Sequence, residues 1–184
     1  MSKKIRLAGI AYESLVNGPG MRRVYFSQGC RHNCEGCFNP DTHDFNGGEE
    51  RDMDELIEDA LDNPLLKGIT FSGGDPLERA AEFAYMAKAF KKAGLNIWCY
   101  TGYTFEKDLL FGAKSRARCE ATDALLRHID VLVDGEFQIE KKDIRLKFRG
   151  SSNQRILDLP QSLAAKKAVW VAEFEPNDDT NNNM

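Results

Sequence analysis

The chain has 184 residues, of which 42% are hydrophobic and 29% are charged, and its net charge at pH 7 is -4. This length suits one domain with a core of its own, which we expect over residues 1–174. No apolar run approaches the roughly 20 residues that span a bilayer, and no basic-then-apolar leader is present, so we expect a cytoplasmic protein without a membrane partner. The acidic balance disfavours nucleic acid as a partner.

Hydrophobic periodicity and turn residues predict an alternation of strands and helices. One short strand is expected within residues 5–16. The other predicted strands lie at residues 22–27, 68–72, 96–100, 129–135 and 153–157, with a weaker one at 169–171. The predicted helices lie at residues 52–61, 77–93, 122–128 and 160–167, with another that starts after an N-cap at Thr104. Such alternation indicates parallel strands joined by right-handed crossovers, in a partial barrel or an open sheet.

Two segments interrupt this alternation. Residues 111–118 carry Lys114, Arg116 and Arg118, and we interpret them as a solvated loop insertion. Residues 175–184 are acidic and rich in asparagine, with one apolar residue. They cannot bury enough apolar surface to order themselves, so we expect a disordered tail.

Three bunched cysteines are the most distinctive feature of the sequence. Cys30, Cys34 and Cys37 have the spacing C-x3-C-x2-C and follow a predicted strand directly. The total of five cysteines is odd, which favours metal or redox chemistry over a disulfide framework. Cys99 lies in an apolar strand and is expected to be a buried thiol, and Cys119 receives no role.

The residues alone leave four uses open for the three bunched thiols: a structural zinc, an iron-sulfur cluster, a redox dithiol, or buried thiols without a ligand. A structural zinc would need His32 or His43 to complete a Cys3His set. An electron-transfer [4Fe-4S] cluster normally takes four cysteines, so a cluster held by three would leave one iron open to a substrate.

The C-x3-C-x2-C spacing, followed by the aromatic Phe38, resembles the radical S-adenosylmethionine (SAM) superfamily. The resemblance implies an α/β fold: a partial (β/α) barrel of mostly parallel strands, with the cluster loop after the first main strand. It implies a [4Fe-4S] cluster on Cys30, Cys34 and Cys37 whose open iron binds SAM. One electron would then cleave SAM into methionine and a 5'-deoxyadenosyl radical. By the same resemblance, Gly36 and Phe38 would line the nucleoside.

A second motif, Ser72-Gly73-Gly74-Asp75-Pro76, follows the predicted strand 68–72. The superfamily places a glycine pair and an acidic residue after its second strand, where the backbone contacts the amino group of the SAM methionine. The resemblance therefore implies that Gly73 and Gly74 line the methionine end, with Asp75 in place of the usual glutamate. A lone Gly-Gly-Asp is more often an ordinary turn, and its position at this strand end is what supports the functional interpretation.

Further motifs resemble the small activating enzymes of anaerobic (class III) ribonucleoside-triphosphate reductases. They are Asn17-Gly18-Pro19-Gly20 and the stretches 100–106, 131–135 and 146–155, of which Phe148 to Arg155 is the most specific. The resemblance implies that the substrate is a protein, the reductase, on which a glycyl radical is made. It also implies a one-electron donor such as flavodoxin or ferredoxin.

Several polar residues keep open roles. Asp134 either faces the site or forms a turn before a glycine. If the cluster is iron-sulfur, we expect His32 and His43 to be solvated loop residues. No task is derived for three polar residues of the most specific motif, Arg149, Asn153 and Gln154.

Two alternatives remain at this stage. One is a different radical SAM enzyme, either another glycyl-radical activase or an enzyme similar to 7-carboxy-7-deazaguanine synthase, although the stretch 149–155 argues against both. The other belongs to a different class: a zinc-stabilised binding module without enzymatic activity.

Overall fold

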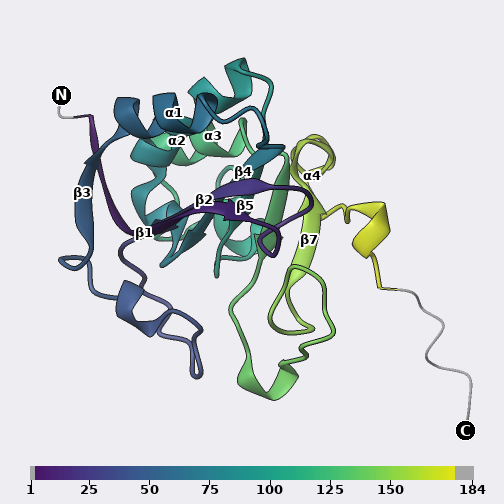
Figure 1. Cartoon of the computed structure of the whole chain (residues 1–184). Helices are drawn as coiled ribbons and strands as arrows, with labels where there is room; N and C mark the ends of the chain where they lie inside the picture. Colours follow the sequence, from purple (N-terminus) through teal and green to yellow (C-terminus); the bar gives the residue numbers. More distant parts are fainter. Residues whose placement is uncertain (1–2, 177–184) are drawn as a thin grey trace, which may run out of the picture.

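A mixed sheet of seven strands runs through the computed structural model, which describes residues 3–176 (Figure 1). The strands are β1 (Lys4–Ser14), β2 (Arg22–Ser27), β3 (Glu49–Asp52), β4 (Gly68–Gly73), β5 (Asn96–Tyr100), β6 (Val131–Asp134) and β7 (Arg155–Asp158). Their order in the sheet is β3-β1-β2-β4-β5-β6-β7. The helices are α1 (Met53–Leu61), α2 (Ala80–Lys92), α3 (Glu120–Leu126) and α4 (Leu159–Ala165).

The four central strands, β2, β4, β5 and β6, are parallel. A helix lies in each connection between them, namely α1, α2 and α3 in turn, because the chain must cross back over the sheet before it can start another parallel strand. Short 3-10 turns occupy Pro40–Thr42, Pro76–Arg79, Ile139–Lys141 and Ala172–Phe174.

The predicted partial barrel of mostly parallel strands is wrong. The sheet is open, and its three outer pairings, β1 with β2, β1 with β3, and β6 with β7, are antiparallel. The turn between β1 and β2 is too short for a crossover, and the chain between β6 and β7 contains no α-helix. Because the connection determines the direction of the next strand, the run of parallel strands ends at β6. The sheet therefore stays open and does not close into a barrel.

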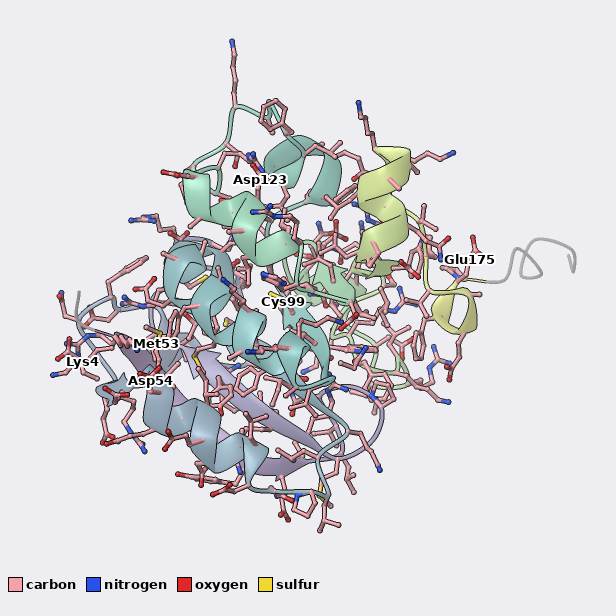
Figure 2. The ribbon with its side chains drawn as sticks, turned by 90° about the horizontal axis from the view of Figure 1, so that it is seen from above. Lys4, Met53, Asp54, Cys99, Asp123 and Glu175 are labelled. Carbon is pink, nitrogen blue, oxygen red and sulfur yellow. The ribbon has the colours of Figure 1, made fainter. Side chains whose placement is uncertain are left out.

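The main core lies between the sheet and α1, α2 and α3, which cover one face. Figure 2 looks down on these helices, with Met53 at the start of α1 and Cys99 of β5 among the buried side chains. The apolar face predicted for the second helix is confirmed, since Phe83, Met86 and Phe90 of α2 are fully buried. Asp52 caps α1 by accepting hydrogen bonds from the backbone of its first turn.

The opposite face of the sheet carries a smaller apolar cluster. Trp98 of β5, Val133 of β6 and Ile156 of β7 form its buried part, and Phe148 and Trp170 pack against them. Among residues 3–176, no α-helix contributes to this apolar cluster, so this face of the sheet is available to line a cavity beside it.

Three element predictions differ from the structure. No strand was predicted at residues 49–52, which form β3. Residues 105–109 form a π-helical turn that Thr104 precedes without a side-chain cap, because the buried carboxylate of Asp134 accepts the Phe105 N–H instead. The weak strand predicted at 169–171 is reduced to one isolated bridge between Leu157 and Trp170.

No helix among the described residues is long and apolar enough to cross a membrane. The tail expected at 175–184 lies outside those residues except for its first two positions.

Candidate metal centre

The three bunched cysteines lie on the loop that follows β2. Its backbone is tied to residues further along the chain: the Gly29 N–H donates to the Thr42 carbonyl at 2.8 Å, and the Cys30 N–H to the His43 carbonyl at 3.3 Å. All three thiols are partly exposed and line a cavity of about 620 Å³. That size lies within the range of small-molecule sites.

The same cavity is lined by the carboxyl ends of the neighbouring strands. Gly73 and Gly74 reach it from β4, Thr101 and Gly102 from β5, and Gly135 from β6. The cysteine loop and the turns after three neighbouring strands therefore meet at one cavity. Further lining comes from aromatic residues on three segments, Phe38, Tyr100, Phe137 and Phe148.

The glycine pair is required by packing. A Cβ on Gly74 would lie 2.4 Å from the Gly29 carbonyl oxygen, and Gly73 has a φ of +94°, which side chains rarely adopt. The Gly74 N–H donates to the Ser27 carbonyl at 2.8 Å. The β4 turn can thus press its backbone against the start of the cysteine loop.

Asp75 lies behind the cavity wall. Its fully buried carboxylate accepts hydrogen bonds from the Thr101 hydroxyl, the Gly102 N–H and the Leu77 N–H, each at 2.9 Å. Asp75 therefore ties the β4 turn to the β5 turn. The structure does not place it among the lining residues, and its predicted contact with SAM stays a prediction.

The expectation that His32 is solvated is wrong. Its side chain is 5% exposed and lies between two carboxylates, with Nε2 3.0 Å from Asp75 and Nδ1 2.7 Å from Glu136. Its ring meets that of Tyr103 edge-on, with centroids 4.4 Å apart. Burial lowers the pKa of His32, but the two carboxylates outweigh burial and raise the pKa above its ordinary value.

His43 is also not a free loop residue. Its Nε2 lies 3.4 Å from the Cys37 sulfur, which also accepts a hydrogen bond from the Asn39 N–H at 3.4 Å. No signal in the sequence distinguished either histidine from a solvated one, because their partners come from tertiary contacts.

Burial makes two of the three thiols, Cys30 and Cys34, unfavourable as free thiolates. Burial raises the pKa of Cys30 to about 11 and also raises that of Cys34. Arg31, the cationic residue next to Cys30 in the loop, forms an ion pair with the buried carboxylate of Glu78. Since only the deprotonated sulfur is a good ligand, binding of a metal must release protons here.

Phe38 and Gly36 differ in position. Phe38 is 61% exposed, lines the cavity and packs on Phe137 with centroids 4.9 Å apart. Gly36, at φ +70°, lies with its Cα toward Ile139 and is not among the lining residues. The predicted contact of Gly36 with the nucleoside therefore remains a prediction.

Asp134 has a structural task. Its carboxylate is 1% exposed, accepts the Phe105 N–H at 2.8 Å and pairs with Arg155, which also binds Glu106. The amide of Gln154 accepts the Gly150 N–H at 2.8 Å, and Arg149 donates to the Gln154 carbonyl at 2.7 Å. These motif residues thus fasten β7 and the chain before it.

Three cysteine sulfurs beside a ligand-sized cavity form a donor set that suits iron or zinc. Within residues 3–176, no three His, Cys, Asp or Glu side chains converge as closely as a single metal ion requires. The choice between zinc and an iron-sulfur cluster therefore depends on the comparison with known proteins.

A family model described as a 4Fe-4S single cluster domain matches residues 16–157, which include the cysteine loop and all four parallel strands. This match places the chain in the class of iron-sulfur proteins with a single cluster domain.

Curated relatives narrow the class. The chain is 38% identical over 151 residues to the anaerobic ribonucleoside-triphosphate reductase-activating protein of Vibrio cholerae, covering 77% of this chain and 90% of the relative. It is 36% identical over 148 residues to that of Escherichia coli K12, covering 76% and 90%. The protein of that name in phage T4 is 35% identical over 150 residues, covering 77% and 86%. The chain belongs to the family of anaerobic ribonucleoside-triphosphate reductase-activating proteins.

Proposed function

We propose that this protein is a radical SAM activase that generates a glycyl radical on an anaerobic ribonucleoside-triphosphate reductase. The observation that carries the proposal is the shared cavity of Cys30, Cys34, Cys37 and the Gly73-Gly74 turn, in a chain that matches a 4Fe-4S domain. The names of the relatives support the choice of partner. We also propose a one-electron donor such as flavodoxin or ferredoxin.

The three cysteines would hold a [4Fe-4S] cluster and the adjoining cavity would hold SAM. When bound, the cluster supplies the electron that cleaves SAM into methionine and a 5'-deoxyadenosyl radical, which takes a hydrogen atom from a glycine of the partner.

The residues of the chain prepare the site in three ways. Burial raises the pKa of the Cys30 and Cys34 thiols, so these two thiols lose their protons when metal binds. Gly73 and Gly74 bring unobstructed backbone to the cavity beside the cysteine loop. Phe38 supplies an apolar ring to the cavity lining.

We propose Phe38, Gly73 and Gly74 as direct SAM contacts, because they line the cavity. Gly36 and Asp75, which lie behind the lining, are proposed to act on SAM through the residues they support. Asp75 holds the backbone of Gly102, and Gly36 allows the cysteine loop to pack closely against Ile139.

The test is anaerobic reconstitution with iron and sulfide. We expect a brown protein with about four irons per chain, which on reduction converts SAM to 5'-deoxyadenosine. Cys34→Ala should abolish both the iron content and the cleavage of SAM, whereas Cys119→Ala, at an exposed thiol outside the cavity lining, should keep both.

Two outcomes would contradict the proposal at different levels. Stoichiometric zinc without deoxyadenosine would refute the radical SAM assignment and favour a zinc-stabilised module. Deoxyadenosine without a glycyl-radical signal in the electron paramagnetic resonance spectrum of added reductase would refute only the proposed partner.

A further inference from the structure

The long excursion between β6 and β7 contains an ordered arm, which we define as residues 139–149. Figure 1 shows this green excursion projecting from the same edge of the sheet as the blue cysteine loop. A bridge pairs Lys142 with Ser151, and the Ser152 N–H donates to the Lys141 carbonyl at 2.9 Å. These contacts fix the base of the arm.

Phe148, close to the C-terminal end of the arm, packs against the sheet. Its ring meets Trp98 of the sheet edge-on at 5.5 Å and Phe174 at 5.7 Å between centroids. Its φ of +57° is uncommon for a side chain of this size and is held in place by that packing. The residues between Lys142 and Phe148 are therefore held at both ends and project outward in a defined position.

Apolar side chains on the arm reach from the cavity to solvent. Leu146 lines the cavity, and Ile144 is 91% exposed. Phe38, on the facing cysteine loop, is also exposed and has the Lys142 ammonium 5.3 Å from its ring centroid. Ile144 and Phe38 thus leave exposed apolar surface on the arm and on the facing cysteine loop.

The charge of the arm is opposite to that of the whole chain. Residues 139–149 hold five basic and two acidic residues, whereas the chain has 25 basic and 29 acidic ones. Arg149 is used within the excursion, and Arg145 pairs with Asp143 at 2.8 Å. Lys141 and Lys147 are exposed, and neither pairs with a carboxylate in the part of the chain that the structure describes.

We propose that the arm is the docking surface for the reductase, and that it binds an acidic segment of that partner with an apolar residue at its centre. Lys141 and Lys147 would attract the acidic segment, and Ile144 would bury itself against the apolar residue. The inference rests on the proposed function. It adds to the proposed function the surface that would position the chain of the reductase over the cavity.

Charge complementarity is what selects this occupant. A second copy of this chain is acidic outside the arm and could also bind the lysines. It is a poorer occupant, because it would have to bind the arm and still leave the cavity accessible. Nucleic acid would use the lysines but gives the exposed Ile144 no partner. Both remain distinguishable in the experiment below.

The experiment uses cluster-loaded protein and its anaerobic reductase, and compares Lys141→Glu/Lys147→Glu with Lys88→Glu/Lys92→Glu. The control lysines are also exposed but lie on α2, which covers the other face of the sheet. We expect charge reversal on the arm to raise the dissociation constant for the reductase, measured by calorimetry, about tenfold or more at low salt. The control pair should change it little. High salt should reduce the difference between them.

A third variant, Ile144→Ser, should weaken binding at low and high salt alike, because burial of apolar surface is not screened. Cleavage of SAM with a chemical reductant and no reductase should be unchanged in all variants, since none of these residues lines the cavity. Unchanged affinity for the reductase in the arm variants would overturn the inference. The inference would also be overturned if the arm variants weakened self-association or oligonucleotide binding and left reductase binding unchanged. Because binding is measured directly, failure of SAM cleavage in the unmodified protein would refute the proposed function separately.

Discussion

His32 and Asp75 illustrate how a single contact links two turns with the cysteine loop. His32 lies between Cys30 and Cys34 in the sequence, and its imidazole contacts the carboxylate of Asp75, which is fully buried behind the turns after β4 and β5. Because an ionised carboxylate is costly to bury without donors, the four donors around Asp75 determine where the adjoining turns can lie. The cysteine loop is thereby held before any metal is bound.

We expect the pKa of His32, measured by nuclear magnetic resonance in the cluster-free protein, to lie above 6.5. Asp75→Asn should lower this pKa, because one of the two carboxylates that raise it is lost while burial, which lowers it, remains. Since folding raises this pKa, the contribution of His32 to stability is complete below about 6.5 and is lost as the pH rises through the folded-state value.

Glu136→Gln is the milder companion variant, because Glu136 is 53% exposed and glutamine keeps a side-chain oxygen that can accept a hydrogen bond from Nδ1 of His32. It should lower the pKa of His32 by less than Asp75→Asn does. A His32 that titrates at or below 6.5 in the unmodified protein would contradict the paired geometry.

At the scale of elements, the turns after β4 and β5 fit against the cysteine loop only because they carry glycine. A Cβ on Gly102 would lie 2.6 Å from the ring of His32, which two carboxylates hold in place. The ring cannot give way without breaking one of those contacts. The close approach of the three segments is therefore sensitive to a single methyl group.

Gly102→Ala should destabilise the protein by about 1–3 kcal/mol and reduce the iron retained per chain, because the methyl group pushes the cysteine loop away. The measurements are thermal unfolding and iron analysis after desalting. Gly9→Ala in β1 is the control: nothing lies within 4 Å of its Cβ, so its effect should stay within about 0.5 kcal/mol. Equal effects from both variants would contradict the proposed clash.

Across the whole molecule, stability and chemistry lie on different parts of the sheet. The helical face buries Tyr25, Phe71 and Phe90 completely, and none of the three bunched cysteines belongs to that core. The uncovered face and the carboxyl ends of the strands carry the cavity. The fold therefore does not depend on the cluster in the way that a zinc finger depends on its metal.

Removal of the cluster by a chelator should leave the far-UV circular dichroism spectrum and a cooperative thermal transition largely intact. Amide hydrogen exchange should accelerate mainly in residues 28–48, whose order depends on the contacts of the cysteine loop. Global unfolding of the cluster-free protein would contradict this separation of core and site.

Local sequence patterns predicted the central elements well. The ranges expected for β2, β4, β5 and α1 agree with the structure to within one residue at each end. β3 was missed because Glu49 to Asp52 contains no apolar residue, and only pairing with β1 makes it a strand. The candidate site was predicted through its cysteines and glycines, whereas His32 was misplaced because its partners are 43 and 104 residues away.

The sequence by itself determined the cysteine spacing, the glycine turns and the amphipathic helices, because these depend on residues close together in the chain. Only the tertiary structure decided the direction of β7, the open sheet and the burial of Asp75 beneath the turns. Strand direction depends on the path of the connection, and burial depends on contacts between distant segments. Neither quantity is encoded in a local pattern.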